Sequence, residues 1–203
     1  NAPGNLISKG VHYKEVPLKG NTYDLQAIAD AVDENTKLVE IQRSRGYMLR
    51  DSLFPSDMKK IIDTVKAKNP NTICFVDNCY GEFTNKEEPI ELGADITAGS
   101  LIKNAGGGLA PTGAYICGRK DLVDRCSCVW TAPGLGGEMG SYAASYRPFF
   151  EGLFLAPHMT RQAMMSAEFC AAVFKLIGFK TSPEPGHLRT DLITTVTLDS
   201  EEN

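Results

Sequence analysis

The stretch "ICFVDNCYGEF", residues 73–83, opens with an apolar run that ends abruptly at Asp77. About one supersecondary unit later, the stretch "ADITAGSLIKNAGGGLAPTGAYI", residues 94–116, places Lys103 shortly before a run of glycines, with Ser100 three positions ahead of it. The sequence thus sets a carboxylate at the end of a predicted strand and an amine in a glycine-rich turn.

Strand and helix patterns alternate on both sides of these stretches. Short runs rich in β-branched and aromatic residues predict strands, and apolar residues at helical spacing predict helices. We expect strands at residues 11–18, 37–42, 72–77, 94–97 and 113–117, and helices that begin at the N-caps Asp24 and Ser56, the second ending at Asn69-Pro70. This order is typical of an α/β protein with a three-layer αβα architecture and a mostly parallel sheet. In such sheets ligands bind beyond the carboxyl ends of the strands, where Asp77 lies.

Beyond residue 119 the pattern becomes mainly helical. We expect a short amphipathic helix at residues 120–130, a glycine loop at 131–140, a segment from Ser141 that Pro148 and Pro157 interrupt, and one long helix at 158–178 that Gly178 ends. The residues "SPEPG" at 182–186 predict a turn, and "LITTVTL" at 192–198 predicts the first strand of a new unit. The sequence therefore divides into residues 1–180 and residues 181–203.

The composition excludes several classes of protein. The chain has 203 residues, of which 42% are hydrophobic and 23% charged, with a net charge of −4. No basic stripe is present to neutralise phosphates, which argues against nucleic acid as a partner. No apolar run approaches the roughly 20 residues that a membrane span requires, and the start "NAPGNLISKG" lacks the pattern of a secretion signal. We therefore expect a soluble, cytoplasmic protein.

The cysteines carry neither a metal-site pattern nor a disulfide pattern. The six cysteines include no C-x-x-C pair, only "CSC" at residues 126–128 is closely spaced, and no histidine lies near a cysteine pair. A structural zinc site needs ligands paired at short spacing. We expect the cysteines to be small buried hydrophobic residues in a reducing compartment, with no metal bound.

Neither glycine-rich stretch fits a nucleotide-binding loop. "GGGLAPTG", residues 106–113, lacks the G-K-[ST] ending of a P-loop, and Lys103 precedes the glycines. Pro111 occupies the last position of a G-x-G-x-x-G pattern there, and Met139 occupies it in "GLGGEMG", residues 134–140.

A buried amine beside a phosphate site, with an acid across a flat ring, is what pyridoxal phosphate (PLP) requires. The cofactor aldehyde condenses with a lysine amine, and its pyridine nitrogen must stay protonated to draw electrons from the substrate. Asp77 suits the nitrogen because a carboxylate favours the charged ring. Lys103 has no charged neighbour in "LIKNA", and the hydroxyl of Ser100 can turn toward a phosphate. The glycines would let the backbone approach the cofactor closely.

The stretches "FVDNCYGEF" and "GSLIKNAGGGLAPTGAYICG" together resemble fold-type I PLP enzymes. More narrowly, they resemble the cysteine and methionine metabolism branch and, within it, the methionine γ-lyase-like family known as aluminium resistance proteins. The stretches "IQRSRGYMLRDSL" and "LRTDLITTV" are also similar to parts of that family. The resemblance implies that Lys103 binds the cofactor aldehyde, that Asp77 partners the pyridine nitrogen and that Ser100 is a phosphate ligand. It further implies that Tyr80 contacts the ring hydroxyl and that Ser44 and Arg45 make additional cofactor contacts.

The same resemblance implies an activity and partners. It implies a PLP-dependent carbon–sulfur lyase of the cystathionine β-lyase or methionine γ-lyase type, acting on a sulfur-containing amino acid. It also implies a homodimer or homotetramer, with "VWTAPGLGGEMGSY", residues 129–142, as an expected interface loop. Within that loop, Trp130 fits a core position equally well.

The chain departs from the family pattern in length. Family members are about twice as long, so we expect a chain truncated at both ends: residues 1–180 as the central part of the PLP-binding large domain and 181–203 as the start of the small domain. The arginine that grips a substrate carboxylate normally comes from the later domain, where Arg189 is the only candidate. A solvent-exposed or salt-bridged arginine is the alternative interpretation of Arg189.

Each site residue also has a purely structural interpretation. An aspartate at a strand end commonly caps a loop, and a lone lysine in a loop is usually a solvated charge. Ser100 alone would be a turn residue, and Tyr80 alone would be a half-buried aromatic. Two further functions stay open: another PLP reaction such as transamination, and a non-catalytic α/β domain that binds a ligand or partner.

Overall fold

The computed structural model describes residues 4–132 and 134–200. Its α-helices are α1 (Leu25–Ala31), α2 (Pro55–Lys68), α3 (Lys120–Trp130) and α4 (Arg147–Leu176). Its strands are β1 (Leu38–Gln42), β2 (Ile73–Asp77), β3 (Ile96–Ser100), β4 (Ala114–Gly118), β5 (Lys180–Ser182) and β6 (Thr195–Thr197). Three 3₁₀ turns complete the described elements: η1 (Ile7–Lys9), η2 (Asn104–Gly106) and η3 (Gly136–Glu138).

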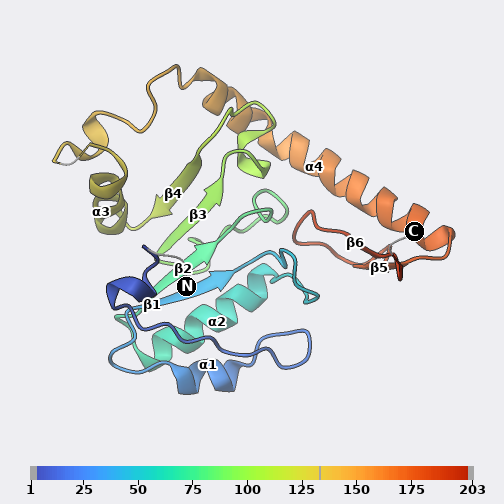
Figure 1. The fold of residues 1–203 in the computed structure, drawn as a ribbon, viewed down its shortest axis with the longest axis horizontal. Helices are drawn as coiled ribbons and strands as arrows, with labels where there is room; N and C mark the ends of the chain where they lie inside the picture. The colour runs from blue at the N-terminus through green and yellow to red at the C-terminus, as the bar shows by residue number, and fades with distance from the viewer. Residues whose placement is uncertain (1–3, 133, 201–203) are drawn as a thin grey trace.

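The main sheet has four strands in the order β1-β2-β3-β4 (Figure 1). β1, β2 and β3 run parallel, and β4 pairs with β3 in the antiparallel sense. The predicted α/β class with a mostly parallel sheet is confirmed. The register pairs Asp77 with Gln42 on one side and with Ala98 on the other, so the carboxyl ends of three strands meet around Asp77.

The core lies between α2 and one face of this sheet. Met58, Ile61, Ile62 and Val65 recur at helical spacing on α2 and are buried. They pack in one cluster with Ile41 of β1, Cys74 and Val76 of β2, and Leu92 and Ala94. Burial of each large aliphatic side chain contributes about 1.5–3 kcal/mol. Because side chains alternate along a strand, burial of Cys74 and Val76 turns Asp77 to the opposite face.

The two predicted helix starts differ in outcome. Asp24 is the N-cap of α1, where its carboxylate accepts hydrogen bonds from the N–H groups of Gln26 and Ala27 at 2.9 and 3.2 Å. The prediction that Ser56 caps α2 is wrong, because the helix already begins at Pro55 with Phe54 as N-cap. Proline is well suited to the first helical position, where no N–H is needed.

The expected strand at residues 11–18 does not form. These residues are without helix or strand, and most of their side chains are exposed. A single bridge, between Lys19 and Thr22, lies just beyond them. Without a neighbouring strand to pair with, a β-rich pattern alone does not make a ladder.

The expected interruption at Pro148 and Pro157 is also wrong. α4 runs unbroken through both prolines for 30 residues, and Pro148 occupies its first turn. Pro157 removes one helical hydrogen bond, which costs about 3 kcal/mol in an unsupported helix. Burial of Gly152, Ala156 and Thr160 on one face holds the helix on both sides of Pro157.

The end of the chain forms a separate two-stranded sheet. β5 pairs with β6 in the antiparallel sense, so the expected strand at 192–198 is confirmed in its centre. β5 precedes the expected turn and was not predicted. The division of the chain at residue 180 stays a prediction, and residues 201–203 lie outside the described ranges.

Two other expectations concern exposed side chains. Of the six free cysteines Cys74 is buried, whereas Cys117 on the edge strand β4 and Cys128 on α3 are exposed, so the expectation that all are buried is wrong. Trp130 is also exposed, which excludes a core position in this chain. Pro133, in the same expected interface loop, lies outside the described residues.

In the described ranges, no helix combines the length and the apolarity that crossing a membrane demands.

The turn that carries Lys103 packs directly on α4. A Cβ atom added to Gly152 would overlap the carbonyl oxygen of Gly106, and one added to Gly107 would overlap that of Gly152. This backbone-to-backbone contact fixes η2, and with it the residue before it, against the long helix (Figure 1).

Substitution Gly152→Ala should therefore destabilise the protein, although alanine is the better helix former by about 1 kcal/mol. We expect a net loss of about 2–4 kcal/mol in the free energy of unfolding, because backbone must move to admit the methyl group. Urea denaturation measures this loss. Gly137→Ala, at a glycine with open space around it, serves as the control and should change little.

Candidate active site

Four of the predicted site residues, Asp77, Tyr80, Ser100 and Lys103, lie at or just after the ends of β2 and β3, whereas Ser44 and Arg45 follow β1. Asp77 is the last residue of β2, Ser100 is the last residue of β3, and Lys103 follows three residues later. The N–H of Lys103 donates to the carbonyl oxygen of Ser100 at 3.3 Å, which closes a tight turn at the strand end. The sheet thus brings together residues from two segments that are separated in sequence by a loop.

Tyr80 lies under the amine of Lys103. The Lys103 Nζ is 4.4 Å from the centroid of the Tyr80 ring, within the range of a cation–π contact. Tyr80 has a φ of 66°, a left-handed conformation that costs a non-glycine residue about 1–3 kcal/mol. The fold holds this strained backbone in place and thereby presents the ring to the lysine.

Asp77 and Cys79 complete the surroundings of the amine. The Asp77 Oδ1 accepts a hydrogen bond from the backbone N–H of Cys79 at 3.0 Å, so the capping role that its strand-end position allows is present. Burial, followed by the neighbouring Asp77 carboxylate, raises the pKa of the Cys79 thiol above its ordinary value. Burial pulls the pKa of Lys103 down, but Cys79, Tyr80 and Asp77 outweigh it, so that pKa lies above its ordinary value.

Ser100 and Ser44 occupy different environments. Ser100 is half-buried, and within the described residues its hydroxyl makes no hydrogen bond. Ser44 is buried, and its hydroxyl donates to the Oδ2 of Asp191 at 2.8 Å. The contacts of Ser44 therefore link it to the end of the chain, and its assignment as a cofactor contact stays a prediction.

Asp191 collects hydrogen bonds from the segment that follows β1. Its Oδ2 accepts from the hydroxyls of Ser44 and Ser52 and from the N–H of Arg45 at 3.2 Å. Its Oδ1 accepts from the N–H of Ile193 at 3.0 Å. We call these groups the Asp191 cluster. It fastens the last described segment to the carboxyl end of β1.

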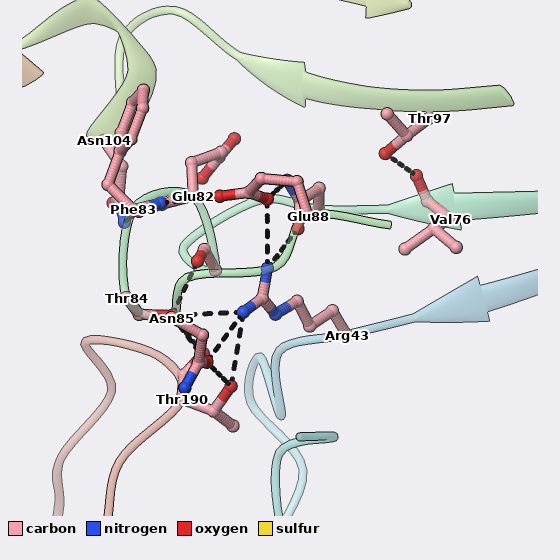
Figure 2. A network of polar contacts seen from close by, with 12 residues as sticks. Arg43, Val76, Glu82, Phe83, Thr84, Asn85, Glu88, Thr97, Asn104 and Thr190 are labelled. Atoms are coloured by element: carbon pink, nitrogen blue, oxygen red, sulfur yellow. Dashed lines mark hydrogen bonds and ion pairs between the residues drawn. The ribbon is translucent and has the colours of Figure 1, made fainter. Parts of the chain in front are cut away.

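Arg43 makes a second set of contacts between these regions (Figure 2). Its side chain is fully buried. Its Nη1 donates to the Asn78 Oδ1 at 2.8 Å and pairs with Glu88 at 3.3 Å. Its Nη2 donates to the Asn85 Oδ1 at 2.8 Å and to the Thr190 Oγ1 at 3.4 Å. One guanidinium thus joins β1, the loop after β2, and the end of the chain.

Sequence reasoning missed Arg43 and Asp191 as organising residues, and also Glu82. The signal available for Arg43 was a charged residue directly after a predicted strand, and for Asp191 one directly before a predicted strand, a pattern that is typical of many exposed loops. Glu82 is 4% exposed, and burial raises its pKa to about 7. Its Oε1 accepts a hydrogen bond from the hydroxyl of Tyr115 at 3.0 Å.

Arg189 is an ion-paired residue, as its alternative interpretation held. Its Nε donates to the Glu168 Oε2 of α4 at 3.0 Å, and its Nη1 donates to the Thr194 Oγ1 at 3.0 Å. Its side chain is 4% exposed, and its Nη2 is buried without a hydrogen-bond partner among the described residues.

Two features lie apart from this group. A surface hollow of about 530 Å³ is lined by residues 32–34, 36–37 and 68–71, at the amino edge of β1 and β2, and none of the predicted site residues lines it. In residues 4–132 and 134–200, no three histidine, cysteine, aspartate or glutamate side chains gather as metal ligands.

A family model described as methionine gamma-lyase matches residues 1–203. The uncharacterized protein YnbB of Bacillus subtilis is 44% identical over 200 residues, which cover 98% of this chain and 48% of that protein.

Two solved structures from clostridia superpose closely. One, from Clostridium acetobutylicum, is described provisionally as a cystathionine beta-lyase involved in aluminum resistance. It is 44% identical, with a TM-score of 0.94 over 100% of this chain and 49% of that one. The other, a carbon-sulfur lyase involved in aluminum resistance from Clostridium novyi, is 42% identical, with a TM-score of 0.93 over 100% of this chain and 48% of that one. The chain spans about half the length of these relatives.

Substitution Asp191→Asn should loosen the end of the chain from β1. An amide replaces one of the two acceptor oxygens with an NH₂ group, which only donates, so at least one N–H or hydroxyl of the Asp191 cluster loses its acceptor. We expect a loss of about 2–3 kcal/mol in the free energy of unfolding, measured by urea denaturation, and faster proteolysis of the segment around residue 190. Asp51→Asn, at an exposed carboxylate nearby, is the control. Equal losses in both variants would contradict the assignment.

Proposed function

The chain belongs to the methionine gamma-lyase family, and on that premise we propose that it forms part of a PLP-dependent carbon–sulfur lyase acting on a sulfur-containing amino acid. The reaction would be an elimination of the β or γ type that releases a thiol. The observation that carries the proposal is the position of the Lys103 amine over the Tyr80 ring, beside Asp77 and at the carboxyl ends of parallel strands. Because the chain spans about half the length of its relatives, the activity is proposed for the full-length protein.

The residues at the strand ends fit this cofactor in their donor chemistry. The Lys103 amine forms no ion pair with a carboxylate among the described residues, so an aldehyde would compete with its contacts to Cys79 and the Tyr80 ring. Ser100 offers a hydroxyl without a hydrogen bond in the described part of the chain, which suits a phosphate oxygen. The cofactor, when bound, supplies an electron sink for the carbanion that forms at the substrate α carbon.

Lys103 is proposed to move the substrate α proton on its Nζ. To accept a proton the amine must first be neutral, and burial already favours that form. The Asp77 carboxylate is one of the groups that oppose it. Pairing of Asp77 with a cationic ring nitrogen would weaken its hold on the Lys103 charge. The same pairing would therefore prepare the ring and release the base.

Asp77 and Tyr80 are proposed to orient the groups that react. Asp77 projects from the sheet face opposite the core, because Cys74 and Val76 of the same strand are buried on the other face. The ring of Tyr80 lies against Nζ and restricts the directions in which Lys103 can extend. A small amino-acid substrate and an assembly of two or four chains are proposed as partners, as the family resemblance implies.

Substitution Lys103→Ala should abolish covalent attachment of PLP in the full-length protein. The visible absorbance band should disappear, and borohydride reduction followed by peptide mapping should find no label at residue 103. Lys86→Ala, at an exposed lysine, is the control and should label as the wild type does. A retained band in Lys103→Ala would refute the assignment. Detection of ammonia and a keto acid as products, and not a new amino acid, distinguishes elimination from transamination.

Substitution Asp77→Asn should leave PLP attached to Lys103 while slowing removal of the α proton by on the order of 100-fold. The amide keeps an oxygen for the Cys79 N–H, so the turn survives and only the negative charge is lost. Exchange of the substrate α proton in deuterated water, followed by NMR, measures the rate. Exchange at the wild-type rate would exclude the proposed role of the carboxylate.

A further inference from the structure

A buried polar cluster lies directly behind the predicted site residues. Its members come from the loop after β2, from η2 and from β4, whose residue pairs with Gly99 of β3. They are Asn78, Glu82, Asn104 and Tyr115. The first three are each less than one-tenth exposed, and Figure 2 shows Glu82 and Asn104 at the edge of the Arg43 network.

Glu82 holds the turn of Lys103 through its backbone. The Asn104 Nδ2 donates to the carbonyl oxygen of Glu82 at 3.0 Å, and Asn104 is the residue that follows Lys103. The Glu82 side chain also supports the end of β3, because a Cβ on Gly99, next to Ser100, would overlap the Glu82 Oε1. Glu82 therefore contacts Asn104, the residue after Lys103, and Gly99, the residue before Ser100.

Two buried acceptor atoms of this cluster have no donor among the described residues. The Glu82 Oε2 and the Asn104 Oδ1 are both buried, and neither has a hydrogen-bond partner among the described residues. Both atoms are acceptors, and a buried acceptor without a donor is costly. A proton on the Glu82 Oε2 converts one of the two acceptors into a donor. The geometry thus favours a neutral carboxylic acid at this position.

The charges that face Glu82 agree with this geometry. Burial is the largest influence and raises the pKa of Glu82 to about 7; Glu88 raises it further, whereas Arg43 and the Tyr115 hydroxyl lower it. The unpartnered Nε of Arg43 is a buried donor in the same region. Ionisation of Glu82 would attract that donor or turn the Asn104 amide, and either change loosens the turn that carries Lys103.

We infer that Glu82 is a positioning residue that works as a neutral carboxylic acid, keeping the Asn104 turn, and hence Lys103, in place for the cofactor aldehyde. The part that concerns the cofactor rests on the proposed function of Lys103. Cofactor affinity should then follow the neutral fraction of Glu82, and it should decline as the pH rises through the pKa of this group.

The test compares the full-length wild type with Glu82→Gln, whose amide reproduces the acceptor and donor of the neutral acid. Titration with PLP at pH 6 and pH 8.5 gives a Kd for each protein. The ratio of the wild-type Kd to the Kd of Glu82→Gln should rise by up to about 30-fold from pH 6 to pH 8.5. Because Lys103 titrates in both proteins, its own effect on the Kd cancels in this ratio. Glu87→Gln, at an exposed carboxylate, should give a ratio near one throughout.

A second readout needs no cofactor. With a raised pKa, the folded protein binds more protons than the unfolded chain between about pH 4.5 and pH 7, so this contribution to stability is lost as the pH rises through that window. The Tm of the cofactor-free wild type should fall relative to Glu82→Gln by several degrees, about 3 °C or more, from pH 5 to pH 8. Tyr115→Phe removes a hydrogen bond that lowers the pKa of Glu82 and should move this step to higher pH.

The outcomes separate the two proposals. If the wild type binds no PLP, the proposed function fails, and the Tm comparison still decides whether Glu82 is neutral. If PLP binds and Glu82→Gln has the wild-type pH dependence in both Kd and Tm, the inference about Glu82 is overturned while the function stands. A step that stays in place in Tyr115→Phe would assign the titration to another group and would also overturn it.

Discussion

The fully buried guanidinium of Arg43 is the constraint on which the arrangement of the site depends. A buried charge is costly unless it is paired and hydrogen-bonded, and Arg43 meets this requirement with groups from two parts of the chain, the loop after β2 and Thr190. The loop after β2 must pass close to the guanidinium, and a side chain at Gly81 would overlap it. The neighbouring Tyr80 adopts a left-handed conformation in this confined turn. The placement of the Tyr80 ring beside Lys103 thus follows from how one arginine is satisfied.

The end of the chain is fastened to the same centre by two separate sets of contacts. Thr190 reaches Arg43 and Asn85, and the adjacent Asp191 accepts hydrogen bonds from the segment after β1. Between the residues that carry the site and this terminal segment runs α4, which packs on η2 at Gly152 and pairs with Arg189 through Glu168. Movement of the terminal segment would therefore be transmitted to the loops around Lys103 through buried polar groups, which have few alternative partners.

Buried polar groups distinguish the carboxyl ends of the strands from the face of the sheet that packs on α2. The face toward α2 is an ordinary hydrophobic core built from alternating strand residues and one helix stripe. At the carboxyl ends of the strands, by contrast, buried side chains include Arg43, Ser44, Asn78, Glu82 and Asn104. Such residues are rarely buried unless they are paired or have a function. Their concentration around Lys103 and Asp77 is what sets this edge apart from the rest of the molecule.

The sequence by itself determined the parts of the protein that depend on local pattern. Strands β1 and β2, the cap of α1 at Asp24 and the apolar face of α2 could be predicted because each rests on spacing within a few turns or a few residues. The grouping of Asp77, Ser100 and Lys103 could be anticipated because parallel strands end at one edge.

Tertiary structure decided the rest. Residues 11–18 have the composition of a strand but no partner, and α4 continues through Pro157 because buried contacts on both sides outweigh one lost hydrogen bond. The partners of Arg43, Glu82 and Asp191 lie up to 147 residues away along the chain. Such pairings leave no periodic trace in the sequence, because a hydrogen bond depends on distance and angle in space and not on separation along the chain.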